Sequence, residues 1–291
     1  MARSEAVSDA LEDQAPMAPA DAMPAPIGLD ADALEERHGT LAAIDILKLT
    51  TSELFAGKLA LVSSFGAESA VLLHMVAGID PFLPVIFLDT EKLFAETLAY
   101  RDRLVSLLAL RDVRTVRPNP ARLALSDPSS DLVERDRDRC CAIRKVEPLA
   151  LALEGFTASI SGRKRFQGGR RGALRVFEND DDGRIKINPL AHWSAQDLKA
   201  YILAHDLPRH PLVADGYLSI GCIPCTDRVR AGEDSRAGRW RGSEKTECGI
   251  HLPAADLHGD SRRSRVPLIK DGAYVEDGWL RIGGEAPLPT A

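Results

Sequence analysis

Short apolar segments alternate with segments of helical periodicity through the central part of the chain, and this alternation restricts the possible folds strongly. The apolar segments predict strands at residues 58–65, 84–89, 113–116 and 157–160. Helical spacing predicts helices at residues 68–75, 93–109 and about 141–153. Strands that alternate with helices form parallel βαβ units. The sequence therefore predicts an α/β fold with a mostly parallel sheet flanked by helices.

The regions outside this alternation carry weaker signals. Apolar residues recur at helical spacing over residues 31–54, and Ser194 followed by Asp197 resembles a capping box that opens a helix through His205. Residues 1–30 are rich in Ala, Pro, Asp and Glu, so we expect a disordered N-terminal arm. The tail over residues 259–291 is punctuated by Gly and Pro and either forms a small hairpin or stays loose.

Composition restricts the partners and the compartment. The 291-residue chain has a formal charge of -6, which argues against a general nucleic-acid-binding surface, and its basic residues concentrate in residues 163–175 and 228–245. It contains no run of eighteen apolar residues and no basic and apolar signal segment, so we expect neither a membrane span nor secretion. The expected location is the cytoplasm, where thiols stay reduced.

The five cysteines fall into two pairs and one single residue. Cys140 and Cys141 are adjacent, Cys222 and Cys225 form a Cys-x-x-Cys turn, and Cys248 stands apart. Adjacent side chains on a helix diverge, so one small tetrahedral ion suits the first pair poorly, whereas the corners of a larger iron–sulfur cube suit it better. The four paired cysteines thus favour one [4Fe–4S] cluster per subunit. Structural zinc, or a redox dithiol beside a buried cysteine pair, remain alternatives.

The fifth cysteine has mostly polar neighbours. Cys248 follows Arg236, Arg239 and Lys245 and precedes His251. Positive charge stabilises a thiolate, so a nucleophilic role is favoured over that of a free surface cysteine.

Three loops at predicted strand ends suit an anionic ligand. The Ser/Gly turn at residues 63–69 precedes a helix, where backbone N–H groups favour a phosphate. Asp89 and Thr90 follow the next strand, and five cations interleave with glycines over residues 161–171. The alternatives are an ordinary turn for residues 63–69, a helix N-cap for Asp89 or Thr90, and a solvated run of charges for residues 161–171.

The motifs combine into a specific pattern. The cysteine pairs, residues 220–226, residues 236–240 and the sequence Glu247-Cys248-Gly249-Ile250-His251 resemble the cluster-containing assimilatory adenylyl-sulfate reductases of the PAPS/APS reductase family. The resemblance covers about residues 31–252. It implies a Rossmann-like fold of the adenine nucleotide alpha hydrolase kind, with a sulfonucleotide- and cluster-binding domain at residues 31–235 and a mobile catalytic segment at residues 236–258.

The resemblance also implies a reaction. Cys248 would attack the sulfate sulfur of adenosine 5'-phosphosulfate (APS), and thioredoxin or a similar dithiol would then release sulfite from the S-sulfocysteine. A homo-oligomer is compatible with this scheme. The positions that match substrate-binding residues of the family are Ser63, Ser64, Gly66, Ser69, Leu88, Lys145, Gly162, Arg170 or Arg171, Arg236, Arg239 and His251, and the cluster ligands are Cys140, Cys141, Cys222 and Cys225.

Three alternatives remain at this point. A reductase of the 3'-phosphorylated sulfonucleotide (PAPS) generally lacks the two cysteine pairs that are present here. A tRNA-thiolating enzyme of the ATP-pyrophosphatase kind requires an ATP loop and an extended basic face, neither of which the sequence contains. A zinc-stabilised binding module would be a non-enzymatic alternative.

Overall fold

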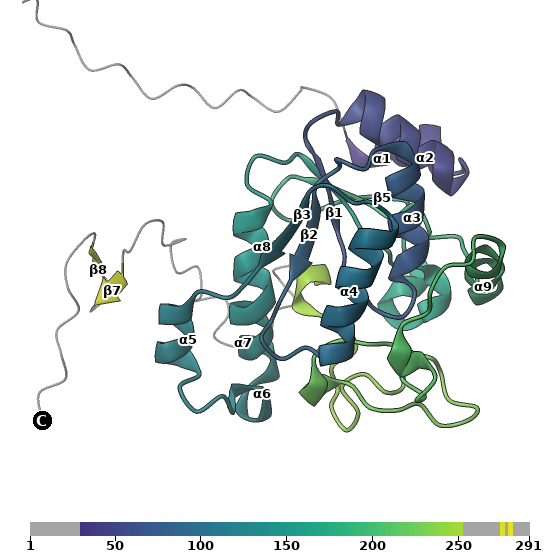
Figure 1. Cartoon of the computed structure of the whole chain (residues 1–291). Coiled ribbons are helices and arrows are strands. Elements are labelled where there is room, and N and C mark those ends of the chain that lie inside the picture. The colour runs from purple at the N-terminus through teal and green to yellow at the C-terminus, as the bar shows by residue number, and fades with distance from the viewer. Residues whose placement is uncertain (1–29, 253–273, 277–278, 282–291) are drawn as a thin grey trace, which may run out of the picture.

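The computed structural model describes residues 30–252, 274–276 and 279–281. A six-stranded sheet in the order β3-β2-β1-β4-β6-β5 forms its centre (Figure 1). All neighbouring strands pair in parallel except β5 and β6, which are antiparallel, so β5 closes one edge. The predicted α/β fold is confirmed. The strands are β1 (Leu59–Val62), β2 (Val85–Leu88), β3 (Val113–Val116), β4 (Ala158–Ile160), β5 (Phe177–Asn179) and β6 (Ile185–Ile187).

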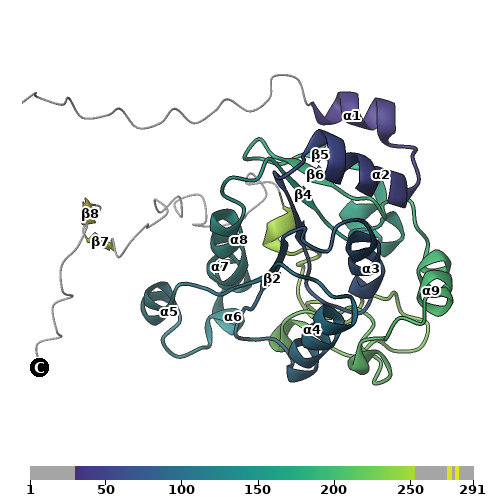
Figure 2. The same cartoon turned by 45° about the horizontal axis from the view of Figure 1, so that its top comes forward.

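Helices cover both faces of this sheet. In Figures 1 and 2, α3 and α4 lie on one face, and α7 and α8 lie on the other. The helices are α1 (Ala31–His38), α2 (Ala43–Leu49), α3 (Ser69–Ile79), α4 (Ala95–Leu107), α5 (Pro120–Ser126), α6 (Leu132–Arg135), α7 (Arg137–Cys141), α8 (Glu147–Ala152) and α9 (Ala195–Ala204). Among the described residues, no helix combines the length and the apolar character that crossing a bilayer requires.

Successive buried side chains of the neighbouring strands β1 and β2 belong to different cores, with the two-residue period of a β-strand. Leu61 of β1 and Phe87 of β2 belong to the large core shared with α3 and α4. Ala60 and Ile86, one position earlier in each strand, pack instead with Leu153 after α8. Because successive side chains of a strand point to opposite faces, one short apolar run supplies both cores.

The strand order places a crevice at the centre of the sheet. The chain proceeds from β1 outward through β2 and β3, and then returns to place β4 on the other side of β1. In open parallel sheets, ligands bind outside the carboxyl ends of the strands at this reversal point. The turns after β1 and β4 are the serine loop and the basic glycine-rich loop singled out in the sequence.

Some predicted elements differ in detail from the observed ones. The predicted helix at about residues 141–153 is divided into α7, a π-helical turn at Ala142–Val146, and α8. The expected capping box is present, since the Ser194 hydroxyl accepts the N–H of Asp197 and the Asp197 carboxylate accepts the N–H of Ser194. The short strands β5 and β6 carry no clear sequence pattern and were not predicted.

In the described part of the tail, β7 (Tyr274–Glu276) and β8 (Trp279–Arg281) form an antiparallel strand pair, which agrees with the hairpin alternative. The disordered arm predicted at residues 1–30 lies outside the described residues apart from residue 30, and so does most of residues 253–291.

Candidate active site

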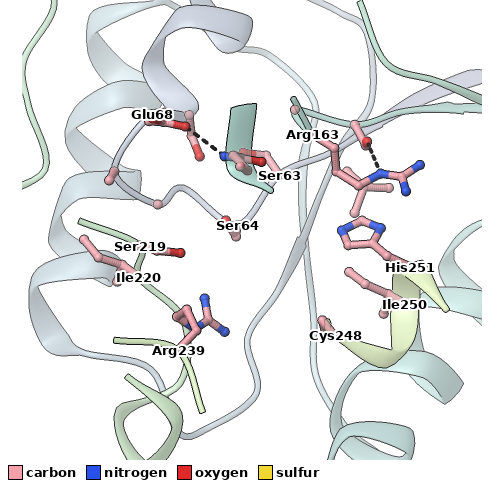
Figure 3. Close-up of a pocket in the computed structure, with 18 of the residues that line it drawn as sticks. Ser63, Ser64, Glu68, Arg163, Ser219, Ile220, Arg239, Cys248, Ile250 and His251 are labelled. Atoms are coloured by element: carbon pink, nitrogen blue, oxygen red, sulfur yellow. Dashed lines mark hydrogen bonds between the residues drawn. The ribbon is translucent and has the colours of Figure 1, made fainter. Parts of the chain in front are cut away.

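A cavity of about 210 Å³ lies at the carboxyl ends of β1 and β4. The loop after β1, the loop after β4, the segment around Arg236 and the segment that ends at His251 all contribute to its wall. Figure 3 shows Ser63, Ser64 and Glu68 on one side and Cys248 and His251 across from them. Among the positions assigned to substrate binding, those that line this cavity are Ser63, Ser64, Gly66, Ser69, Leu88, Lys145, Gly162, Arg171, Arg236, Arg239 and His251.

Arg170 is the one predicted position that does not line this cavity. It faces a neighbouring depression together with Lys245 and Thr246. Of the two arginines that the sequence left open, the structure places Arg171 at the central cavity.

The loop after β1 has a constrained backbone. Phe65 is buried with a φ of 47°, and its N–H donates to Ser63 Oγ at 3.2 Å. A Cβ at Gly66 would lie 3.2 Å from Ser64 Oγ and 3.4 Å from Ile220 O, so a larger residue would push against the cavity wall. The loop thus holds the start of α3 next to the cavity, where a helix N-terminus favours an anion.

The basic loop after β4 is paired with carboxylates. Lys164 Nζ donates to Glu68 Oε2 at 2.6 Å, and Arg163 Nη2 donates to Glu178 Oε2 at 2.5 Å. Burial lowers the pKa of Lys164, and Glu68 only partly offsets this effect. The sequence analysis missed Glu68 and Glu178, because neither carboxylate is close to its partner along the chain. These cations are therefore fixed side chains and not a solvated run.

Arg236 and Arg239 stack on one tryptophan. Their guanidinium carbons lie 5.6 Å and 4.5 Å from the centre of the Trp240 ring. Arg239 Nε also donates to the carbonyl of Cys225 at 3.3 Å, and a Cβ at Gly221 would overlap the Arg239 guanidinium. Burial lowers the pKa of Arg236 to about 10, with a further contribution from neighbouring arginine charge. The arginine pair is thus tied to the Cys-x-x-Cys turn.

Cys248 is buried where the cavity meets the remaining cysteines. A hydrogen bond from the Cys141 thiol lowers the pKa of Cys248, and the charge of Lys145 contributes in the same direction against the effect of burial. Burial alone would lower the pKa of Lys145, but the neighbouring sulfurs of Cys248 and Cys222 outweigh it and raise that pKa. The arrangement favours a thiolate at Cys248 facing a cation.

His251 lies on the same segment as Cys248. Its backbone N–H donates to the carbonyl of Cys248 at 2.9 Å, while its buried Nδ1 has no hydrogen-bond partner among the described residues. Burial lowers the pKa of His251, and the charges of Arg163 and Arg171 lower it further. The imidazole is therefore neutral, with one nitrogen available to a ligand.

The paired cysteines surround an apolar region next to Cys248. Cys140, Cys222, Cys225 and Cys248 pack together with Leu132, Val133, Ile143 and Trp240. Thr90 Oγ1 lies 3.1 Å from Cys222 Sγ, so the turn after β2 reaches this region. Within the described part of the chain, no three His, Cys, Asp or Glu side chains are grouped closely enough to hold a single metal ion.

A buried ion pair supports the helix that carries Cys140 and Cys141. Arg144 Nη2 donates to Asp127 Oδ2 at 2.8 Å, and Arg144 Nη1 donates to the carbonyl of Thr90 at 2.9 Å. Both side chains are almost completely buried. The sequence analysis missed this pair, although two charged residues near a cysteine pair could have suggested it.

The fold and the cavity define an α/β protein that places a cysteine against a crevice lined by basic side chains at the carboxyl edge of its sheet. The chain belongs to the phosphoadenosine phosphosulfate reductase family, since the model of the phosphoadenosine phosphosulfate reductase domain matches residues 58–228. Relatives with a more specific name include the adenosine 5'-phosphosulfate reductase of Mesorhizobium japonicum. That protein is 52% identical over 231 residues, which cover 79% of this chain and 91% of the relative.

Two further similarities place the chain within this family. The phosphoadenosine 5'-phosphosulfate reductase of Gloeobacter violaceus is 40% identical, covering 77% of this chain and 96% of that protein. The crystal structure of phosphoadenylyl-sulfate (PAPS) reductase from Candida auris, a phosphate complex, has a TM-score of 0.58 and 27% identity, covering 70% of this chain and 99% of that one.

Proposed function

We propose that this protein reduces APS to sulfite and AMP with electrons from thioredoxin or a similar dithiol. The observation that carries the proposal is the position of Cys248, which lies at the wall of a cavity that also presents a phosphate-type loop and arginines. The names of the relatives at 52% identity support APS as the substrate.

In the first step, the Cys248 sulfur attacks the sulfate sulfur of APS. A bond forms between the two sulfur atoms, the bond from sulfate to the bridging oxygen breaks, and AMP leaves with the electron pair. The loop at residues 63–69 is positioned to bind the nucleotide phosphate, and Arg171, Arg236 and Arg239 are positioned to bind the phosphosulfate. Neutral His251 can contribute one further hydrogen bond to the bound anion.

In the second step, a thiolate of the external dithiol attacks the Cys248 sulfur and sulfite leaves. The second thiol of the reductant then resolves the mixed disulfide, so the dithiol supplies both electrons and becomes a disulfide. Such a partner is required because the other four cysteines are assigned to cluster binding.

We infer that the four paired cysteines bind a [4Fe–4S] cluster. Cys140, Cys222 and Cys225 belong to one group of packed buried residues, and Cys141 is adjacent to Cys140 in the chain. Thiolates are the usual ligands of iron–sulfur clusters. When bound, the cluster would supply negative charge next to Lys145, and we infer that it adjusts charge and position without carrying the electrons of the reaction.

We infer a reducing compartment such as the cytoplasm, where thiols remain available as cluster ligands and as a nucleophile. Reduction of PAPS is the second candidate, because one relative at 40% identity carries that name. The two cysteine pairs favour APS over PAPS. A homo-oligomer remains a prediction.

The proposal is tested by incubating the purified protein with APS labelled in its sulfur, without a reductant. An adduct with the mass of a sulfite group is expected on the wild-type chain, and it should be lost in Cys248→Ser. A labelled adduct that persists in Cys248→Ser would overturn the assignment of the nucleophile. Metal analysis that finds zinc and no inorganic sulfide would instead favour the zinc-binding alternative.

A further inference from the structure

Glu247, immediately before Cys248, is a buried carboxylate at the wall of the cavity. Its side chain is 6% exposed. Arg171 Nε donates to Glu247 Oε2 at 2.6 Å, and Arg171 Nη2 donates to Glu247 Oε1 at 2.8 Å. Two parallel hydrogen bonds between a guanidinium and a carboxylate fix the relative orientation of both groups.

The same carboxylate also holds the backbone of Cys248. The N–H of Cys248 donates to Glu247 Oε1 at 2.9 Å, and Arg236 Nη2 lies 3.5 Å from that oxygen. Arg171 belongs to the turn at Gly169–Ala173 after β4, whereas Arg236 belongs to a loop that follows the Cys-x-x-Cys turn. One oxygen atom therefore connects the peptide of Cys248 to two other segments, whose arginines lie 76 and 11 residues from Glu247.

This carboxylate is poorly suited to increasing the affinity for an anion. Burial raises the pKa of Glu247, but the charges of Arg171 and Arg236 outweigh that effect and lower it, so the group is ionised. A negative charge in a cavity that binds a sulfonucleotide repels the ligand and neutralises part of the arginine charge. Glu247 therefore contributes through the positions in which it holds its hydrogen-bond partners.

We propose that Glu247 is a positioning residue that holds the peptide of Cys248 and the guanidinium of Arg171 in a fixed relation. When the Cys248 peptide and the Arg171 guanidinium are both held, the Cys248 sulfur faces the phosphosulfate that the arginines bind. Glu247 acts through Arg171 and the Cys248 peptide, and it neither contacts the reacting atoms nor exchanges a proton. This inference rests on the proposed role of Cys248 as the nucleophile.

The test compares Glu247→Gln with Glu244→Gln in the full-length protein with its metal content intact. Glutamine keeps the shape of Glu247 but removes the charge and presents an NH₂ group to one arm of the Arg171 fork. Glu244 is exposed, lies three positions earlier in the same segment and loses the same charge, so it is a matched control. The two readouts are the rate of S-sulfocysteine formation at saturating APS and the affinity for AMP.

In Glu247→Gln we expect adduct formation to slow about tenfold or more, because small misplacements of a reacting group have effects of this size. The affinity for AMP should be unchanged or higher, because the arginines lose a competing anion. Glu244→Gln should match the wild type in both readouts. This separation of rate from affinity distinguishes positioning from a general loosening of the cavity.

Three results would overturn the inference: an adduct rate in Glu247→Gln within about twofold of the wild type, a parallel loss of AMP affinity, or an equal loss of rate in Glu244→Gln. A wild-type chain that forms no adduct, or an adduct that persists in Cys248→Ser, would refute the proposed function as well. A normal wild-type adduct together with an unaffected Glu247→Gln variant would refute only the role of Glu247.

Discussion

Lys145 shows how one side chain can serve two neighbouring sites. It lines the substrate cavity, and the sulfurs of Cys141, Cys222 and Cys248 all raise its pKa. A cation in this position stabilises the attacking thiolate and attracts the anionic substrate. Both effects depend on the charge of Lys145, so a neutral side chain of similar volume can test them.

Lys145→Met is therefore expected to slow formation of the S-sulfocysteine by about tenfold or more, since roughly 1.4 kcal/mol of lost charge stabilisation suffices for that factor. The measurement is single-turnover mass spectrometry with APS. Lys199→Met, at an exposed position of α9, removes the same charge and should react at the wild-type rate. Equal rates in both variants and the wild type would exclude the assigned role.

His210 gives a second prediction at the scale of one residue. Its Nδ1 accepts the N–H of Leu212 at 3.2 Å, so the proton lies on Nε2, which is 3.0 Å from Thr97 Oγ1. Burial lowers the pKa of His210 from 6.5 to about 4, with a small opposing effect of Glu96. The unfolded chain therefore binds a proton more tightly than the folded chain at this residue.

Because this pKa is lower in the folded state, the contribution of His210 to stability is complete above pH 6.5 and is lost as the pH falls toward about 4. By about pH 5 the loss should reach roughly 2 kcal/mol. Urea denaturation at about pH 7.5 and pH 5 would measure it, and the decrease should be smaller in His210→Gln. The same decrease in both proteins would assign the pH dependence to other groups.

At the scale of elements, the π-helical turn at Ala142–Val146 carries a side chain that links it to two other segments. Arg144 lies in this turn, and its guanidinium reaches both Asp127 and the carbonyl of Thr90. Thr90 in turn contacts Cys222 Sγ. The turn thus connects the helix of one cysteine pair to the loop beside the other pair, and π-helical turns often occur at functional sites.

Arg144→Met is expected to destabilise the protein by about 3 kcal/mol, because it leaves the Asp127 carboxylate buried without its cation. It should also reduce the iron and sulfide content per chain. Arg135→Met breaks the exposed pair with Asp131 and should change neither quantity appreciably. Denaturation curves measure the loss of stability, and metal analysis measures the iron and sulfide content. An unchanged iron content in Arg144→Met would show that this turn does not contribute to cluster binding.

The prediction of elements succeeded where local pattern determines structure. The buried strands and the helix capped by Ser194 were identified because apolar runs and capping residues act over a few neighbours. The strands β5 and β6 were not, because three-residue strands owe their pairing to the rest of the sheet. The π-helical turn has no local sequence pattern that distinguishes it from the flanking α-helices, so it could not be predicted.

The prediction of the site has the same limit. The cysteines and arginines could be named because their chemistry and spacing are visible in the sequence. The pairing of Glu68 and Glu247 with cations could not be recognised, because the partner of Glu68 lies 96 residues away and that of Glu247 lies 76 residues away. Buried carboxylates are rare unless they are paired, but sequence alone does not reveal which of them are buried.

At the scale of the whole molecule, the charges of the chain are segregated. The formal charge is -6, yet the cavity gathers Lys145, Arg171, Arg236 and Arg239. An anionic ligand is therefore attracted to this cavity. A group of cations in one cavity agrees with a small anionic substrate.

Binding of AMP should accordingly stabilise the folded protein. A concentration of about a hundred times Kd adds about 2.7 kcal/mol to the free energy of unfolding, which raises Tm. Adenosine, which lacks the phosphate, should raise Tm less, and added salt should reduce the difference between the two ligands. Equal shifts for AMP and adenosine at every salt concentration would show that the loop and the arginines do not bind the phosphate.

The burial of Cys248, which is 8% exposed, has a practical consequence for selective labelling. In the conformation of the structure, bulky maleimides or dyes cannot approach this sulfur until the segment that carries it moves, as it must for the external dithiol, whereas an electrophile mounted on a nucleotide-sized scaffold would be delivered to it through the cavity. Inhibitors that form a covalent bond should therefore gain selectivity from the shape of their carrier, and a mildly reactive warhead would be sufficient.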